Sequence, residues 1–285
     1  MSGTPALRTN PHGFRRDVHP PRTPSVPGTC DCHMHVVGPY ATYPLRETRS
    51  FTPPESTLDD YRATARTVGI DRMVVVQPSF FGKDNACTLD SVARMEGRAR
   101  AVVVIDPDIA DDALQAMHDR GARGVRLQMV ATGGLSLDHV ERVAARIRPL
   151  GWHVQLYLDA RRLPDLAERL RRLPVDIVFD HMAHVEPDSG EDEEGFRILL
   201  DLLAGGRAWV KLSNALFPAS AERARRLIAA NPERALWGSD WPHVAYGEEP
   251  PDDGALLDAL ADWAGDEATR RRVLVDNPTA LYFRT

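Results

Sequence analysis

The sequence predicts an α/β fold, a distorted (β/α)8 TIM barrel preceded by an extended, proline-rich N-terminal arm. Two observations predict it. Short apolar segments rich in Val, Ile and Leu recur from Cys30 onward, and segments with helical spacing lie between them. The length of 285 residues also suits a barrel that forms a single domain. We therefore expect an arm over residues 1–28 and one barrel domain over residues 29–285.

The arm comes first in the chain. Residues 1–28 contain six of the 22 prolines and almost no apolar periodicity, which predicts an extended or partly disordered segment. This segment lacks the apolar core of a signal peptide, and no stretch of the chain reaches the length of about eighteen apolar residues that a membrane helix needs. We expect a cytoplasmic protein without a membrane partner.

The strands and helices follow in alternation. Eight strands are expected, at residues 30–37, 72–79, 99–107, 122–130, 151–159, 175–182, 207–214 and 234–240. Helical segments are expected at residues 58–69, 88–99, 111–121, 137–151, 162–174, 196–206, 220–232 and 253–265. Several helical segments close on a glycine, the usual residue after a helix C-terminus, as at Gly69, Gly121 and Gly151. This order predicts a parallel barrel.

The charge composition indicates which classes of binding partner are expected. The chain has 41 acidic against 35 basic residues, a balance that indicates neither a nucleic-acid surface nor attraction to an anionic membrane. A small-molecule carboxylate or lactone is the expected partner, and a homo-oligomer is compatible with the sequence. Three cysteines, two of them one residue apart, are expected to be reduced thiols rather than a disulfide framework.

Candidate catalytic residues lie at predicted strand ends. In a barrel of this kind the active site is formed where the strands run into their following loops. The first strand ends with His33 and His35, the sixth with His181 and the eighth with Asp240. A single histidine is more often structural, but these four groups converge on one mouth, so we interpret them as catalytic.

Alternation along the strands adds candidate substrate-binding residues. Side chains of one parity face the helices and those of the other face the interior. The inward or strand-end positions give Arg126, Gln128, Tyr157, Lys211, Ser79 and His243. Arg126 either pairs within the barrel or binds an anionic group of the substrate, because a buried guanidinium needs a partner. Tyr157, Ser79 and Lys211 are equally consistent with scaffold hydrogen bonds. Cys30 and Cys32 have the parity opposite to His33 and His35, which predicts that they face the helices.

The chain resembles a known superfamily through a set of motifs. These are "DCHMH" at residues 31–35 together with Cys30 before them, "RGVRL" at 123–127, "DHMAH" at 180–184, "WVKLS" at 209–213, "GSDWPH" at 238–243 and "DNPTALYF" at 276–283. In combination they resemble the amidohydrolase superfamily, and within it the branch that contains 2-pyrone-4,6-dicarboxylate lactonase and the sugar lactonases. The resemblance spans nearly the whole chain from Cys30 onward.

The resemblance implies hydrolysis of a lactone from the catabolism of an aromatic or sugar acid. Asp240 would activate water, while His33, His35 and His181 would donate hydrogen bonds to the oxygen that becomes negative. Metal enzymes of the superfamily also use a histidine at the end of the fifth strand, where this chain has Tyr157 and Asp159. A site without metal or other cofactor is therefore favoured. The alternative is zinc held by His33, His35 and Asp240, in a decarboxylase or hydratase of an aromatic acid.

The chain differs from the dicarboxylate lactonase pattern at positions that would determine how many carboxylates the substrate carries. Phe217 stands where that enzyme would be expected to have an arginine, and the "VATGG" segment after the fourth strand contains no cation. Loops after the sixth and eighth strands are acidic, as in "EPDSGEDEEG" and "GEEPPDDG". We expect a substrate with one carboxylate or none. A barrel that binds a ligand without catalysis is a further alternative, but it leaves the full set of strand-end groups unexplained.

Overall fold

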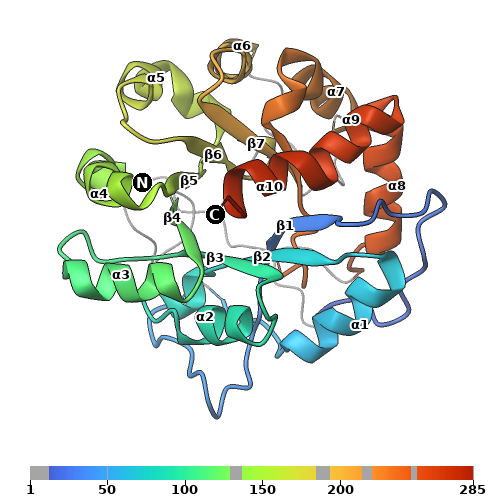
Figure 1. The fold of residues 1–285 in the computed structure, drawn as a ribbon, viewed down its shortest axis with the longest axis horizontal. Coiled ribbons are helices and arrows are strands. Elements are labelled where there is room, and N and C mark those ends of the chain that lie inside the picture. The colour runs from blue at the N-terminus through green and yellow to red at the C-terminus, as the bar shows by residue number, and fades with distance from the viewer. Residues whose placement is uncertain are drawn as a thin grey trace.

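The structure is a computed structural model that describes residues 13–49, 51–128, 137–183, 193–213, 220–244 and 249–284. Eight parallel strands form one sheet in chain order. They are β1 (Cys30–Met34), β2 (Arg72–Val76), β3 (Ala99–Val103), β4 (Ala122–Gln128), β5 (His153–Tyr157), β6 (Ile177–Phe179), β7 (Ala208–Leu212) and β8 (Ala235–Trp237). A bridge between Met34 in β1 and Trp241, which follows β8, links the two ends of the sheet and gives the predicted barrel (Figure 1).

Helices surround the barrel as the alternation predicts (Figure 1). They are α1 (Leu58–Val68), α2 (Ala86–Ala93), α3 (Asp111–Asp119), α4 (Val140–Ile147), α5 (Leu163–Arg171), α6 (Glu193–Ala204), α7 (Ser220–Ala230) and α8 (Asp253–Ala264). Shorter turns are η1 (Ser79–Phe81), η2 (Leu137–His139), η3 (Arg148–Leu150), η4 (Ala160–Arg162), η5 (Asp180–Ala183) and η6 (Pro232–Arg234). The strands end earlier than predicted because residues such as Ser79 and Asp180 already belong to the turns at the mouth.

The sequence analysis did not predict the elements after α8. These are α9 (Glu267–Arg271), the π-helical turn η7 (Arg272–Asp276) and α10 (Asn277–Tyr282), which lies across the barrel in Figure 1. Tyr282 at the end of α10 is fully buried among the side chains of the barrel interior. The C-terminal segment therefore covers the N-terminal end of the strands and leaves the opposite end for the site.

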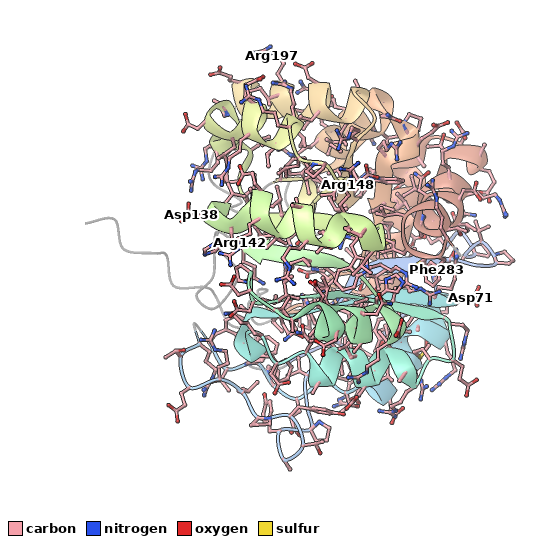
Figure 2. The ribbon with its side chains drawn as sticks, turned by 60° about the vertical axis from the view of Figure 1, so that its left-hand side comes forward. Asp71, Asp138, Arg142, Arg148, Arg197 and Phe283 are labelled. Atoms are coloured by element: carbon pink, nitrogen blue, oxygen red, sulfur yellow. The ribbon has the colours of Figure 1, made fainter. Side chains whose placement is uncertain are left out.

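Local signals in the sequence account for the helix ends. Thr57 and Asp60 form a capping box at the start of α1, in which each side chain accepts a hydrogen bond from the backbone N–H of the other residue. Gly69 ends α1 in the left-handed conformation, with φ 78°. Many charged residues of the helices and turns lie on the outer surface, as Asp138, Arg142, Arg148 and Arg197 show in Figure 2.

Two apolar clusters lie on the two sides of the barrel wall. The larger one joins the outward side chains of the strands to the helices and includes Val125, Leu127, Val154 and Leu156. The smaller one fills the interior and includes Val74, Val102, Val178, Trp209 and Leu236. These assignments agree with the alternation that predicted Arg126, Gln128 and Tyr157 to face inward on the fourth and fifth strands.

The prediction for Cys30 and Cys32 was wrong. Both side chains are buried and belong to the interior cluster, not to the face that packs on the helices. The pairing of β1 with β2 is regular at Asp31 and resumes at Met34, with a register shift between them. Such a bulge places one extra residue in the strand and breaks its alternation. Cys32 and His33 can then both face inward, although they are neighbours in the chain.

The described part of the arm is extended and packed. Residues 13–28 contain no helix or strand, and they run beside α8 and α1, in dark blue in Figure 1. Phe14 and Val26 are buried, and Ser25 donates a hydrogen bond to the carbonyl of Val68 at the end of α1. None of the described helices is long and apolar enough to cross a membrane.

Candidate active site

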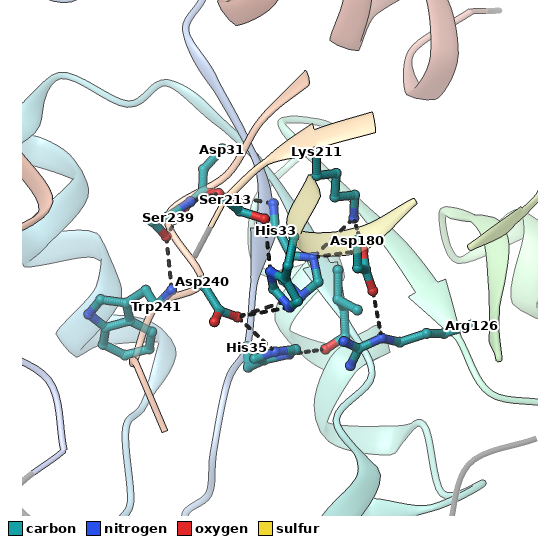
Figure 3. A network of polar contacts seen from close by, with 12 residues as sticks. Asp31, His33, His35, Arg126, Asp180, Lys211, Ser213, Ser239, Asp240 and Trp241 are labelled. Carbon is teal, nitrogen blue, oxygen red and sulfur yellow. Dashed lines mark hydrogen bonds and ion pairs between the residues drawn. The ribbon is translucent and has the colours of Figure 1, made fainter. Parts of the chain in front are cut away.

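Asp240 is the focus of the polar side chains at the mouth of the barrel (Figure 3). It follows β8, and its backbone N–H donates to the carbonyl of His33. Its Oδ1 atom lies 3.7 Å from Nε2 of His33, 3.6 Å from Nε2 of His35 and 3.9 Å from Nε2 of His181. The structure thus brings together the four residues that the sequence analysis singled out as catalytic.

The pKa values in this cluster are shifted. Burial alone would raise the pKa of Asp240, but the facing imidazoles of His181, His35 and His33 hold it below its usual value. Burial lowers the pKa of His33 well below the ordinary value, and it also lowers the pKa of His181. The carboxylate of Asp240 is therefore ionised at neutral pH.

His35 has a fixed tautomer. Its Nδ1 atom lies 2.7 Å from the carbonyl oxygen of Val76 at the end of β2. A carbonyl oxygen only accepts hydrogen bonds, so Nδ1 carries a proton. Nε2 is then the ring atom that faces Asp240, and it is free to bind a cation unless it carries a second proton. Without a second proton on the ring, two electron-rich atoms face each other at 3.6 Å. Such an arrangement suits a cation or a shared proton between them.

Asp180 is the central residue that the sequence analysis missed. It is fully buried in η5, directly after β6. Its carboxylate lies 3.1 Å from Nε of Arg126, 3.5 Å from Nζ of Lys211 and 3.1 Å from Nδ1 of His33. Burial alone would raise the pKa of Asp180, but these three groups hold it well below its usual value. The alternation of side chains could have predicted this position. Val178 faces the interior, and Asp180, two residues later, has the same parity.

Lys211 and Arg126 both form ion pairs with Asp180. Lys211 donates to the side-chain oxygen of Gln155 at 2.7 Å, and its Nζ lies 3.3 Å from Nδ1 of His33. Arg126 lies over the ring of Tyr157, with 5.4 Å between Cζ and the ring centroid. Arg126 is therefore salt-bridged within the barrel, and contact with substrate remains a prediction for it and for Lys211.

The other predicted substrate-binding residues lie at different distances from this centre. The ring centroid of Tyr157 is 5.2 Å from that of His181, so Tyr157 borders the cluster. Gln128 is buried at the end of β4, and its Oε1 has no hydrogen-bond partner in the described structure. Ser79 begins η1 after β2. His243 is fully buried and contacts Asp253 at the start of α8, with 3.1 Å between Nε2 and Oδ1.

Several residues discussed from the sequence lie outside the described residues. They are Phe217, the segment "VATGG", the last residue of the "DHMAH" motif and most of the acidic loop after β6. Of the acidic loop after β8, only Gly247 and Glu248 lie outside the described residues. Asp159 is among the described residues. It caps η4 and pairs with Arg161 at 2.8 Å.

Comparison with known proteins identifies the family. The family model described as amidohydrolase matches residues 30–284, which is nearly the whole chain. This chain belongs to the amidohydrolase family. It is 38% identical over 283 residues to 4-sulfomuconolactone hydrolase of Hydrogenophaga intermedia, covering 95% of this chain and 93% of that protein. It is 34% identical over 275 residues to 2-pyrone-4,6-dicarboxylate hydrolase of Comamonas testosteroni, covering 90% of each.

A solved structure supports the same assignment. A protein of Agrobacterium tumefaciens, solved in its apo form, superposes on this amidohydrolase with a TM-score of 0.85 at 30% identity. The match covers 95% of this chain and 99% of that chain. The family that the motifs indicated and the barrel that the alternation of strands and helices predicted are therefore confirmed.

The donor atoms of this amidohydrolase fit a divalent metal ion. His33, His35 and Asp240 each offer one ligand atom, and these atoms all lie within 4.8 Å of one another. Nε2 of His33 is buried and has no hydrogen-bond partner among the described residues. Nδ1 of His35 is held by a carbonyl and Nδ1 of His33 faces a carboxylate, an arrangement typical of histidines that bind metal through the other nitrogen. A second group, His33, Asp180 and His181, meets the same distance limit, but Asp180 already balances two cations.

Proposed function

We propose that this protein hydrolyses a lactone that carries one carboxylate, with Asp240 as the general base. One observation carries the proposal: three imidazole nitrogens converge on a single ionised carboxylate oxygen at the mouth of the barrel. The names of the relatives, which are hydrolases of a muconolactone and of a pyrone, support a lactone rather than an amide or a phosphate ester.

The reaction is general base and then general acid catalysis by one group. The Asp240 carboxylate takes a proton from water as the water oxygen bonds to the lactone carbonyl carbon. The protonated carboxyl then returns that proton to the ring oxygen as the carbon–oxygen bond of the ring breaks. The product is a hydroxy acid, and Asp240 is regenerated as a carboxylate. At neutral pH Asp240 is a carboxylate, the form that can accept the first proton.

His181 is the imidazole best suited to donate a hydrogen bond to the developing oxyanion. Its Nδ1 lies 2.9 Å from the hydroxyl of Ser213, which can donate to that nitrogen and leave the proton on Nε2. Nε2 faces the same space as Asp240. His35 cannot take this role as a neutral ring, because its proton is on Nδ1. The three histidines, which the sequence treated alike, are thus assigned different tasks.

We assign the substrate carboxylate to Arg126. Its Nε pairs with Asp180, while its guanidinium lies over Tyr157 at the border of the cluster. A planar guanidinium has five N–H donors, so a pair with Asp180 leaves others for a second carboxylate. Lys211 is fully buried between Asp180 and Gln155, which makes it part of the scaffold in this proposal.

The absence of a histidine at the end of the fifth strand favoured a site without metal. The position of His35, whose Nδ1 is held by the carbonyl of Val76 while Nε2 faces Asp240, favours the alternative in which a metal ion is bound. His33, His35 and Asp240 would hold the ion, which would polarise the lactone carbonyl and acidify water when bound. We expect protein purified without added metal to contain about one equivalent of a divalent ion. Metal analysis of the protein as purified and after chelation checks this. Full turnover at a metal content well below one equivalent would contradict the metal alternative. A proton shared by Nε2 of His35 and the Asp240 carboxylate would then account for their approach.

A screen of lactones by acid release tests the proposed function. We expect turnover of lactones with one carboxylate, and weaker turnover of their uncharged methyl esters because Arg126 loses its anionic partner. The alternative reaction, decarboxylation or hydration of an aromatic acid, would release carbon dioxide or consume water without net acid. A panel in which no lactone yields acid while an aromatic acid is consumed would overturn the lactonase proposal.

A further inference from the structure

Asp240 is held in a backbone conformation that needs outside support. Its φ is 65° and that of His243 is 62°, so two residues with side chains adopt the left-handed region within one short turn. The backbone carbonyl of Asp240 accepts from the N–H of His243 at 2.8 Å, which closes the turn. Residues in this region persist when surrounding contacts fix them. The contacts around the turn therefore decide where the carboxylate points.

The barrel supports the inner side of the turn. The hydroxyl of Ser239 donates to Asp31 at 2.5 Å, and the hydroxyl of Tyr61 on α1 donates to the same oxygen at 2.8 Å. The N–H of His35 donates to the carbonyl of Trp241. Asp31, Ser239 and Trp241 appear beside Asp240 in Figure 3. These contacts fix the residues on both sides of Asp240 to β1.

The outer side of the turn is supported by the start of α8. His243 and Asp253 are both buried and lie 3.1 Å apart. Asp252, the residue before Asp253, caps α8 by accepting from the N–H of Gly254 at 3.0 Å. A displacement of the start of α8 would therefore move His243, which contacts Asp253. His243 would in turn move Asp240, because its N–H donates to the Asp240 carbonyl.

The N-terminal arm contacts both of these supports. The ring of Phe14 packs on Trp241 at 4.9 Å between centroids. At His19 both the backbone N–H and Nδ1 contact the Asp252 carboxylate, with Nδ1 at 2.6 Å. The backbone of His19 also runs so close to Gly254 that a Cβ there would stand 2.0 Å from the His19 carbonyl oxygen. Glycine at 254 is what allows the arm to lie on α8.

We propose that residues 13–28 position Asp240, acting through Phe14 on Trp241 and through Asp252 and Asp253 on His243. His243 is then a positioning residue that acts through the turn and not a substrate contact. The proposal rests on the base role of Asp240 proposed above. Arg126, the group assigned to the substrate carboxylate, is on β4 and makes none of these contacts. Release of the arm should therefore lower kcat and leave KM nearly unchanged.

Gly254→Ala tests this in the full-length protein. The new methyl group cannot share space with the His19 carbonyl, so the arm is expected to leave α8. We expect kcat to fall on the order of tenfold to a hundredfold, as for a small displacement of a catalytic group, with KM within about twofold of the wild type. Amides of the peptide spanning residues 237–244 should also exchange hydrogen faster. Trypsin cleavage after Arg15, Arg16 or Arg22 reports whether the arm has been released.

Gly205→Ala is the matched control. A Cβ at Gly205 would meet only carbonyl oxygens at 3.4 Å and 3.5 Å, which are ordinary contacts. Its kcat, amide exchange and trypsin sensitivity should equal those of the wild type. If trypsin does not cleave Gly254→Ala, Phe14→Ala replaces it as the test, with Asp17→Ala as its control at an exposed position nearby.

The outcomes separate the two proposals. Unchanged kcat and unchanged exchange at residues 237–244 in a variant whose arm is cleaved by trypsin would overturn the positioning role. A wild-type protein that hydrolyses no lactone would overturn the proposed function. In that case the exchange measurement, which needs no substrate, still decides whether the arm fixes the Asp240 turn.

Discussion

Asp240→Asn is expected to lower kcat on the order of 10³-fold or more, because the amide cannot accept a proton from water. Asn has nearly the same shape and can keep the turn that follows β8. The substitution removes the base and, where a metal ion is bound by His33, His35 and Asp240, also its anionic ligand, so the metal content of the variant is measured alongside. The backbone N–H of residue 240 still donates to His33. The measurement is kcat and KM for the best lactone of the screen, together with the Kd of its hydroxy acid product.

The controls for Asp240→Asn separate chemistry from binding. We expect the Kd of the product to change by less than about tenfold, because Arg126 holds its carboxylate in our proposal. Asp201→Asn removes an exposed carboxylate from the outer helix α6 and should leave kcat unchanged. Residual turnover of Asp240→Asn within tenfold of the wild type would exclude this residue as the base.

Asp180→Asn is expected to lower the free energy of unfolding by about 3–5 kcal/mol, the usual cost of breaking a buried ion pair on one side. Asp180 is the anion that Arg126 and Lys211 share, and the side chains of Asp180 and Lys211 are fully buried. Without it, two cations remain in the interior with neutral partners only. Urea unfolding of the variant and the wild type measures the difference.

A second substitution makes the Asp180 test specific. Lys211→Met removes one of the two cations, so the double variant Asp180→Asn with Lys211→Met should recover part of the lost stability. If Asp180→Asn alone does not fold, the free energy of unfolding of the double variant is compared with that of Lys211→Met instead. Asp201→Asn, with an exposed carboxylate, should stay within about 0.5 kcal/mol of the wild type. Equal stability of Asp180→Asn and wild type would mean that Asp180 does not balance these charges.

Much of the architecture follows from the sequence because its signals are local. Runs such as "RMVVV" in β2 and "AWVKL" in β7 are apolar over the length of one buried strand, and the helices between them have apolar faces and capping residues. Parallel strands with helical connections then place His33, His181 and Asp240 at one end of a barrel. Each of these inferences needs only the residues near one position in the chain.

Strict alternation is a weaker guide where a strand is irregular. It gives the correct side for Arg126 on β4, but it gives the wrong side for Cys30 and Cys32 because β1 contains a bulge. Nothing in "CDCHM" marks the extra residue, since the register shift appears only when β1 is paired with β2. The helix α10 was missed for a related reason, because its role is to cover the barrel and not to continue the repeat.

The sequence by itself determined the barrel, the family and the group of histidines and aspartate at the mouth. The tertiary structure decided which atoms of that group face each other: that Val76 fixes the tautomer of His35, that Asp180 balances Arg126 and Lys211, and that the arm lies against the Asp240 turn. The physical reason is that a tautomer or an ion pair depends on distances of a few ångströms between residues far apart in the chain. Such distances are set by packing and register, which no local pattern contains.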